Sequence, residues 1–272
     1  MTRIILTFGL IFLAATAKAQ TLTFGVVPQQ SAKKMAALWT PIFQHINQQS
    51  GLQIQFSTAK DIPTFEKRLL SGEYDIAYMN PYHYTVFSQK PGYQAIAKQK
   101  NKRIKGIMVV RKDSDIQQLA ELNDKTLAFP SPAAFAASVL PRAKMNQDGI
   151  SFKPQYVSSH DSVYLSVARG FFPAGGGVMR TFNNTSEDVR KQLKVMWTTP
   201  GYTSHAIAVH PRIGGELSNK IQQALLNLND TKEGQRLLKS INFKGMEIAN
   251  DKQWDDVRTL DIKLLDHLLG SR

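Results

Sequence analysis

The chain contains no cysteine among its 272 residues. Disulfide bonds, zinc–thiolate centres, iron–sulfur clusters and thiol nucleophiles are therefore excluded together. Charged residues make up only 20% of the chain and hydrophobic residues 42%, a balance that argues against disorder and supplies enough apolar side chains for real cores. The length favours one large domain or two smaller ones.

Familiar catalytic patterns are missing as well. The sequence has no Gly-x-Ser-x-Gly elbow, no His-Glu-x-x-His pair and no Gly-x-x-x-x-Gly-Lys-Ser/Thr phosphate loop. His205 and His210 lie across a predicted strand that ends at Pro211, a placement that disfavours metal binding by both. We therefore expect no enzymatic activity, no catalytic residue, no metal ion and no cofactor.

Only the N-terminus carries an apolar run that suggests a membrane signal. Arg3 is followed by the apolar stretch 4–15 and by a small-x-small site at Ala17 and Ala19. Residues 1–19 are expected to be a signal peptide cleaved before Gln20; a buried first helix is the alternative. With no cysteine after that site, a lipid anchor is not expected, and the product is predicted to be free in the periplasm.

The formal net charge is +13. Lysine and arginine are scattered, apart from a basic run over residues 98–105. A solvated basic surface is the simpler interpretation, although a positive field also helps to capture an anion. No groove-reading motif is present, so nucleic acid is not expected as a partner.

After residue 20 the hydrophobic pattern alternates between strands and helices, which is typical of α/β proteins with parallel sheets. A glycine run at 175–177 is expected to precede a strand over 178–182, and residues 216–269 are expected to be mainly helical. No Pro/Gly/Ser-rich linker appears, so extended strands are expected to join two lobes. Residues 20–105 and 205–272 are predicted to form lobe 1, and residues 106–204 lobe 2.

Ligands of open α/β sheets bind beyond the carboxyl ends of strands, against helix N-termini. Asn80 can cap a helix there, Ser159 and His160 offer a hydroxyl and an imidazole, and Arg180 can pair with an anion. Each has a structural alternative, namely capping, packing or, for the glycine run, a surface turn. The predicted ligand-binding residues are Tyr78, Asn80, Tyr82, Ser131, Ser159, His160, Gly176 and Arg180.

Several motifs together resemble the phosphonate-type (PhnD-like) periplasmic binding proteins. They cover nearly the whole mature chain and lie at residues 24–28 (FGVVP), 39–41 (WTP), 72–82 (GEYDIAYMNPY), 113–116 (DSDI), 159–162 (SHDS) and 200–207 (PGYTSHAI). The resemblance implies a type II periplasmic-binding fold, in which two lobes joined by two crossover strands close on a ligand like a hinge. It also implies capture of phosphonate, phosphite or phosphate for an ABC importer, without chemistry on the ligand.

The chain departs from the family pattern near the expected ligand. Ala133–Ala137 stands where phosphonate binders commonly carry Ser-Thr-Ser, with Ser131 and Ser138 as the nearest hydroxyls, and the usual tyrosine after the second strand is replaced around Ile62. The glycine run and Arg180 occupy the segment where amine-recognising relatives place an acidic residue, which disfavours an aminophosphonate. His160 matches the ligand-contacting histidine of the family.

Two functions follow from this resemblance. The first is a monomeric periplasmic protein that captures a small anionic ligand and delivers it to an ABC permease. The second is a ligand-sensing module that presents the closed lobes to a membrane sensor protein, either a histidine kinase or a cyclic-nucleotide enzyme.

Overall fold

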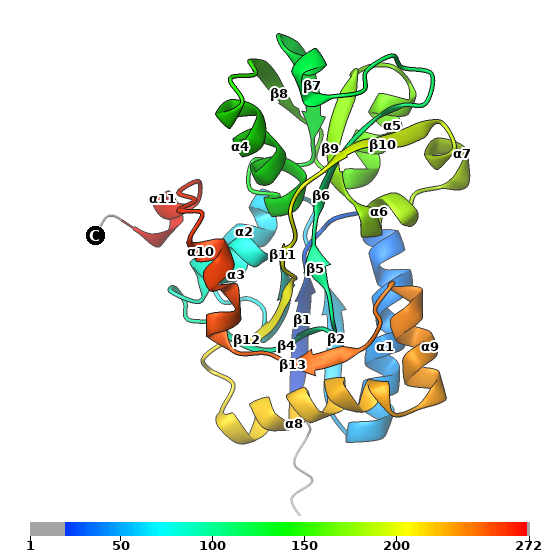
Figure 1. The fold of residues 1–272 in the computed structure, drawn as a ribbon. Coiled ribbons are helices and arrows are strands. Elements are labelled where there is room, and N and C mark those ends of the chain that lie inside the picture. The colour runs from blue at the N-terminus through cyan, green and yellow to red at the C-terminus, as the bar shows by residue number, and fades with distance from the viewer. Residues whose placement is uncertain (1–19, 271–272) are drawn as a thin grey trace, which may run out of the picture.

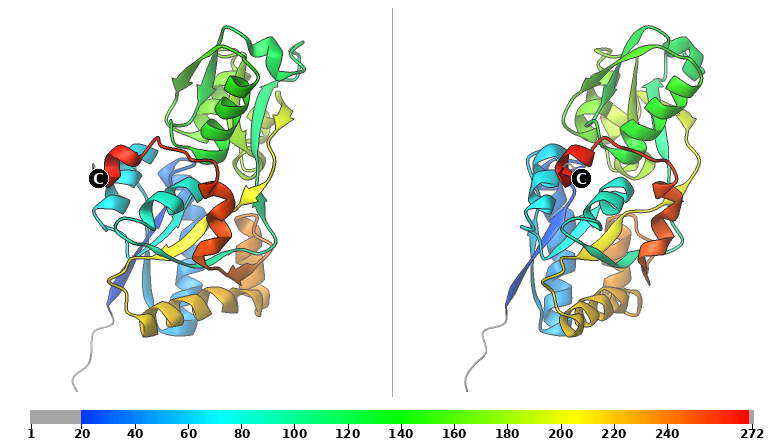
Figure 2. Two further views of the ribbon diagram at one scale, coloured as in Figure 1. Left: turned by 60° about the vertical axis from the view of Figure 1, so that its left-hand side comes forward. Right: turned by 90° about the vertical axis from the view of Figure 1, so that its left-hand side faces the viewer.

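The computed structural model describes residues 20–270 and divides them between two α/β lobes, one above the other in Figures 1 and 2. The predicted α/β fold class is confirmed. The predicted signal peptide, residues 1–19, lies outside the described residues.

A six-stranded mixed sheet in the order β13-β4-β12-β3-β1-β2 forms the centre of the first lobe. In this sheet β1 is parallel to β2 and to β3, whereas β12 is antiparallel to both of its neighbours and β13 is antiparallel to β4. The strands are β1 (Thr21–Val26), β2 (Gln53–Ser57), β3 (Ile76–Met79), β4 (Gln94–Gln99), β12 (Ala206–Val209) and β13 (Met246–Ile248).

The first helix, α1 (Ala32–Ser50), shows how the sequence sets an element's bounds. The Ser31 hydroxyl accepts a hydrogen bond from the Lys34 N–H at the start, and Gly51, with φ of 69°, ends the helix. Serine is a preferred N-cap and glycine a preferred helix terminator, so both bounds follow from local sequence. Pro41 lies inside the helix without ending it, and the side chains that include Trp39 and Ile46 are buried on one face.

The remaining helices of this lobe cover both faces of the sheet. Because α1 joins β1 to β2 and α2 returns from β2 to β3 on the other side of β1, right-handed crossovers place α1 and α2 on opposite faces. The helices are α2 (Ile62–Leu70), α3 (Pro81–Phe87), α8 (Gly215–Leu226), η3 (Asn227–Asn229), α9 (Lys232–Ser240), η4 (Asp251–Trp254), α10 (Asp255–Arg258) and α11 (Asp266–Leu269).

The second lobe has a five-stranded sheet in the order β10-β6-β9-β7-β8. Its strands are β6 (Gly106–Arg111), β7 (Lys125–Phe129), β8 (Phe152–Tyr156), β9 (Ala174–Val178) and β10 (Leu193–Thr198). Its helices are η1 (Leu119–Leu122), the π-helical turn η2 (Phe135–Val139), α4 (Leu140–Gln147), α5 (His160–Ala168), α6 (Met179–Asn183) and α7 (Glu187–Arg190).

Two short antiparallel strands, β5 (Arg103–Ile104) and β11 (Tyr202–Thr203), cross between the lobes (Figure 1). Every strand of the six-stranded sheet falls within residues 20–105 or 205–272, and every strand of the five-stranded sheet within 106–204. This division supports those boundaries, which we propose as the limits of the two lobes, with β5 and β11 as the hinge.

Two local predictions were wrong. The glycine run is itself the strand, β9, and residues 179–183 form the helix α6 rather than a strand. A Cβ on Gly176 would lie 1.9 Å from the Ala137 carbonyl oxygen, so only glycine fits this position of the sheet. The predicted helical region after residue 216 also contains β13, a three-residue edge strand whose pairing with β4 has no local signal.

The lobes are closed on each other. The segment Ala133–Ala137 of the second lobe belongs to the same hydrophobic cluster as Tyr78 and Ile104. Across the boundary the Asn80 side-chain amide donates to the Ala133 carbonyl at 3.2 Å, and the Gln30 amide donates to the Asp161 carboxylate at 3.1 Å. These contacts bring the carboxyl ends of β1, β3 and β7 together at one boundary.

Candidate functional site

Two adjoining cavities lie between the lobes and share three lining residues, Ile104, Val178 and His205. We call them the inner and the outer cavity. The inner cavity is lined by Val27, Gln29, Ile62, Asn80, Ile104, Ala134, Phe135, Ala136, Ala137, His160, Val178 and His205. Its volume of about 10 Å³ accommodates about one water molecule, so a ligand reaches it only when the lobes separate.

One side of the inner cavity is polar. The Gln29 side-chain amide donates to Nε2 of His205 at 3.1 Å, and the Gln29 Oε1 atom is buried without a hydrogen-bond partner. The Gln29 carbonyl in turn accepts from the His160 backbone N–H across the lobes at 3.1 Å. The opposite side is formed by Ala134–Ala137, whose side chains are methyl groups and the Phe135 ring, so no polar side chain faces the cavity from there.

His160 lies at the first turn of α5 and is only 2% exposed. Its Nδ1 atom is 3.2 Å from the Thr181 hydroxyl, which also lies 2.7 Å from the Tyr164 hydroxyl. Burial, and to a smaller extent the charge of Arg180, lowers the pKa of His160 to about 3. The same two causes, in the same order, lower the pKa of His205 well below its usual value. Both imidazoles are therefore neutral at neutral pH in the closed lobes.

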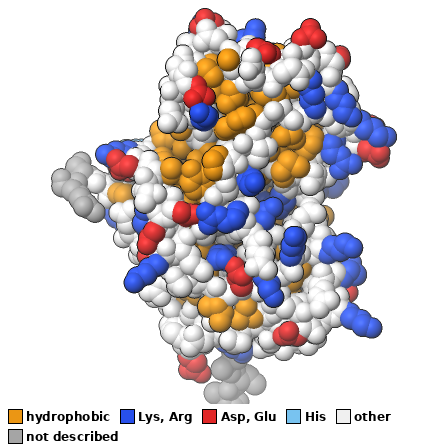
Figure 3. Space-filling model, viewed as in Figure 1, with side chains coloured by type: hydrophobic (Ala, Val, Ile, Leu, Met, Phe, Trp, Pro, Cys, Tyr) orange, Lys and Arg blue, Asp and Glu red, His pale blue; other side chains and the backbone are white. Residues whose placement is uncertain are grey.

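The outer cavity is larger, about 160 Å³, and is rich in cations. It is lined by Tyr78, Gln99, Lys102, Arg103, Ile104, Lys105, Val178, Met179, Arg180, Ser204 and His205. In the space-filling view, Lys and Arg side chains gather in the middle of the face, where β5 and β11 run in Figure 1 (Figure 3). The lining contains no aspartate or glutamate.

Arg180 extends from α6 toward the first lobe. Its guanidinium carbon lies 5.9 Å from the centre of the Tyr78 ring, within the range of a cation–π contact. Its Nη2 atom is buried without a hydrogen-bond partner, and no carboxylate within residues 20–270 forms an ion pair with it. A guanidinium held in this way has donors that an anion between the lobes would satisfy.

The structure brings four of the eight predicted residues to the cavities: Tyr78 and Arg180 at the outer one, Asn80 and His160 at the inner one. Asn80 also has its predicted capping role, since its Oδ1 accepts from the His83 N–H at 2.8 Å.

The other four lie away from both cavity linings. The Tyr82 hydroxyl accepts from the Leu265 N–H at 2.8 Å, and Ser159 caps α5 by accepting from the Ser162 N–H at 3.0 Å. Ser131 is buried with its hydroxyl unpartnered. Gly176 lies within the sheet, where its close approach is to Ala137 of the same chain.

Sequence reasoning overlooked Gln29, His205 and Lys102. Gln29 comes three residues after the end of β1, in the kind of position where the rule on strand ends places ligands. His205 lies in a segment that was weighed only for metal binding, and Lys102 lies in the basic run that was interpreted as a solvated surface. Nothing local distinguishes them, because only lobe closure brings the three segments to the two adjoining cavities.

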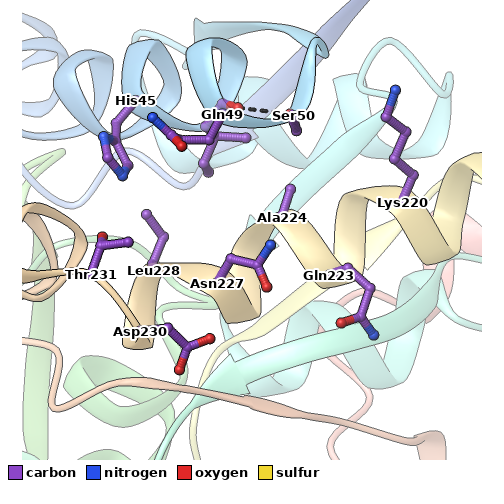
Figure 4. Close-up of a pocket in the computed structure, with 11 residues that line it drawn as sticks. His45, Gln49, Ser50, Lys220, Gln223, Ala224, Asn227, Leu228, Asp230 and Thr231 are labelled. Carbon is purple, nitrogen blue, oxygen red and sulfur yellow. Dashed lines mark hydrogen bonds between the residues drawn. The ribbon is translucent and has the colours of Figure 1, made fainter.

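A separate groove of about 560 Å³ lies on the first lobe alone, between α1 and the α8–η3 segment. Figure 4 shows His45 and Gln49 on one wall, with Lys220, Asn227 and Asp230 among the residues opposite. The few charged groups of this groove include the Asp230 carboxylate, and the groove lies away from the boundary between the lobes. Convergent donors and a cavity that opens with hinge motion favour the site between the lobes instead.

Within residues 20–270, no set of three or more His, Asp or Glu side chains is placed to hold a metal ion. In that same part of the chain, no helix has both the length and the apolar character needed to cross a bilayer.

The comparisons with known proteins agree with this geometry. Residues 24–254 match the model of the family described as "ABC transporter, phosphonate, periplasmic substrate-binding protein". The Phosphate-import protein PhnD of Mycolicibacterium smegmatis is 21% identical over 75% of this chain and 70% of its own length. The Phosphonates-binding periplasmic protein of Escherichia coli is 22% identical over 90% of this chain and 77% of its own.

Among solved structures, PhnD1 of Prochlorococcus marinus, in complex with methylphosphonate, superposes with a TM-score of 0.80 at 21% identity, covering 90% of this chain and 98% of that one. This likeness establishes the fold.

Two α/β lobes that close on a cavity beside a two-stranded hinge define a substrate-binding protein of the type II periplasmic fold. Since the family model matches most of the chain, the chain belongs to the family of periplasmic substrate-binding proteins of phosphonate ABC transporters. The resemblance drawn from the sequence motifs is thereby confirmed. Membership implies a small ligand, a membrane permease as partner and a location outside the cytoplasmic membrane.

Proposed function

We propose that this protein captures a small oxyanion of the phosphonate or phosphate class between its lobes and delivers it to the permease of an ABC importer. The observation that carries the proposal is Arg180, a partly buried guanidinium without a carboxylate partner among the described residues, next to the polar wall of the inner cavity. The names of the relatives from Mycolicibacterium smegmatis and Escherichia coli support the same ligand class.

The proposed ligand enters while the lobes are open and loses its water when they close. Withdrawal of water strengthens each charge-assisted hydrogen bond, which is how a few donors give useful affinity. His160 donates through Nε2 when the Thr181 hydroxyl proton points to Nδ1, at 3.2 Å, rather than to the Val178 carbonyl, at 3.0 Å. The Gln29 amide and Arg180 complete the proposed set of donors, because the Ala-rich segment contributes no hydroxyl to this cavity.

We propose binding without chemistry on the ligand. Ser159 and Ser204 each adjoin a cavity histidine in sequence. The Ser159 hydroxyl caps α5, and the buried Ser204 oxygen has no hydrogen-bond partner, so neither has a base placed to activate it. The N-terminal signal peptide, the monomeric state and the absence of nucleic-acid binding belong to the same proposal.

The test is isothermal titration calorimetry with phosphate, phosphite, methylphosphonate and methanesulfonate, using wild-type protein, Arg180→Met and a matched control, Arg190→Met. Arg190 lies in α7 on the surface, where it donates to the Asn183 carbonyl. We expect binding of at least one phosphorus oxyanion, a loss of about tenfold or more in Arg180→Met, and little change in the control. Absence of binding by all four anions at millimolar concentration would refute the proposal.

The sensing alternative is supported by the same Ala-rich segment, since it removes hydroxyl donors at the point where importers of this family hold their ligand. Uptake of the bound anion by cells with and without this protein separates the two functions. Uptake that persists after deletion of this protein, together with ligand-dependent co-purification of a membrane kinase or cyclase, would favour sensing.

A further inference from the structure

The outer cavity has a composition that capture of a simple phosphonate does not require. Four cationic side chains line it, namely Lys102, Arg103, Lys105 and Arg180, and no acidic side chain does. Of these four, only Arg103 has a carboxylate partner among the described residues, Asp256 at 2.8 Å. The cavity therefore concentrates positive charge that this chain leaves uncompensated.

These cations also repel one another. Partial burial, followed by the positive charges of Lys244, Arg180 and Lys105, lowers the pKa of Lys102. Repulsion of this kind is relieved when an anion enters, so the cavity favours a negatively charged occupant over a neutral or a cationic one.

Hydroxyl groups at the same cavity could bind such an occupant. The Ser204 oxygen is buried without a hydrogen-bond partner, and the Tyr78 ring lies against both Arg180 and His205, whose ring is stacked on it at 4.8 Å. Ser204 and Tyr78 thus add neutral donors to the four cations, a combination that suits a carboxylate or a phosphoryl group.

The position of the outer cavity relative to the inner one is equally important. The two share Ile104, Val178 and His205, so a ligand whose head group widens the inner cavity beyond the about 10 Å³ of this closed state directs its substituent into the outer one. A volume of about 160 Å³ is below the roughly 300 Å³ at which pockets for drug-sized molecules begin. The space therefore suits a short charged substituent rather than a nucleobase or a long chain.

We propose that the outer cavity is an anionic subsite, and that the preferred ligand is a phosphonate or phosphate ester with a second acidic group two or three bonds away from the phosphorus. This proposal rests on the proposed function, which supplies the phosphorus oxyanion in the inner cavity. Methylphosphonate, which has no acidic tail, is accordingly a minimal ligand, and 2-aminoethylphosphonate, whose tail is cationic, is a poor one.

The experiment compares four probes by calorimetry: methylphosphonate, 3-phosphonopropionate, 2-aminoethylphosphonate and succinate. In wild-type protein we expect 3-phosphonopropionate to bind about tenfold or more tightly than methylphosphonate, because a charge-assisted hydrogen bond contributes about that factor. We expect 2-aminoethylphosphonate to bind more weakly than methylphosphonate.

The variants Lys102→Met and Lys105→Met test the residues, with Lys100→Met as the matched control, since Lys100 belongs to the same basic run but does not line either cavity. In both cavity variants the ratio of 3-phosphonopropionate to methylphosphonate affinity should fall toward one, whereas the control keeps the wild-type ratio. Neither Lys102 nor Lys105 belongs to a hydrophobic core, so their substitution leaves the cores intact.

The outcomes separate this proposal from the proposed function. If methylphosphonate binds but the acidic tail gives no advantage, or if Lys100→Met lowers the ratio as much as Lys102→Met, the subsite proposal fails and the proposed function stands. If succinate binds as tightly as 3-phosphonopropionate, the basic subsite is supported and the phosphorus head group is refuted. If no probe binds, both proposals fail.

Discussion

Acidification should open the lobes of the ligand-free protein. The closed state keeps His160 neutral, with a pKa of about 3. Lobe opening removes Gln29 and the rest of the first lobe from this imidazole and returns its pKa toward the ordinary value of about 6.5. Between pH 3 and pH 6.5 the open state therefore binds more protons than the closed state, so closure loses free energy as the pH falls below 6.5.

The magnitude follows from this pKa difference. At pH 5 an exposed imidazole is almost fully protonated, whereas the buried one is neutral. If opening restores the full ordinary pKa of His160, protonation stabilises the open state relative to the closed one by about 2 kcal/mol through this residue alone. His205 acts in the same direction, since burial and Arg180 lower its pKa as well. The other charged groups around His160 are Arg180 on α6 and Asp161 on α5, which belong to the same lobe as His160 and stay beside it when the lobes separate, so the change in burial alone drives the effect at His160.

The absence of cysteine makes the measurement direct. A spin-label pair at Lys153→Cys on β8 and Lys220→Cys on α8 reports the distance between the lobes by double electron–electron resonance. We expect the distance distribution to shift to longer values between pH 7.5 and pH 5. The same pair in a His160→Gln, His205→Gln background should show a much smaller shift. Equal shifts in both backgrounds, or no shift in the first, would refute the reasoning.

Two further predictions concern stability. Gly176→Ala places a Cβ 1.9 Å from the Ala137 carbonyl oxygen and should lower the free energy of unfolding, measured by urea titration, by about 1–3 kcal/mol. The control Gly215→Ala, whose Cβ meets no atom within 4 Å, should leave the stability unchanged. Equal stability of the two variants would contradict the packing argument. Asp61→Ala removes the cap of α2 and should cost about 1 kcal/mol at pH 7. Because its hydrogen bond to Thr64 lowers the pKa of Asp61, this difference should shrink as the pH falls below about 4, and a loss independent of pH would count against the cap.

Much of the fold followed from local patterns. Ser31 and Gly51, residue types that begin and end helices, stand at the two ends of α1, and the alternation of strands and helices predicted two α/β lobes. The rule that ligands bind beyond strand ends led to Asn80 and His160, which both line the inner cavity. These inferences succeed because capping, periodicity and strand polarity are encoded within a few residues.

The remaining features depend on contacts between distant segments. A run of three glycines has the composition of a turn, yet it forms β9 because Tyr164, Val163 and the Ala137 carbonyl leave no room for side chains beside it. Likewise Lys102 belongs to a basic run with no local motif, and its place at a cavity depends on the hinge that brings Arg180 opposite. Neither arrangement has a signature within a sequence window.

The alanines of segment 133–137 and the glycines of the sheet form one packing unit. A Cβ on Gly106 would lie 1.8 Å from the Ala136 carbonyl oxygen, and one on Gly176 would lie 1.9 Å from that of Ala137, so η2 lies directly on β6 and β9. Phe135 packs edge-on against the Tyr202 ring at 5.6 Å, beside the hinge. This wall is apolar and tightly packed, and it cannot supply the hydroxyls that the family resemblance led us to expect there. On our proposal, selection among oxyanions therefore depends on the facing polar wall and on the cations of the outer cavity, so the charge of the ligand's tail decides what this protein captures.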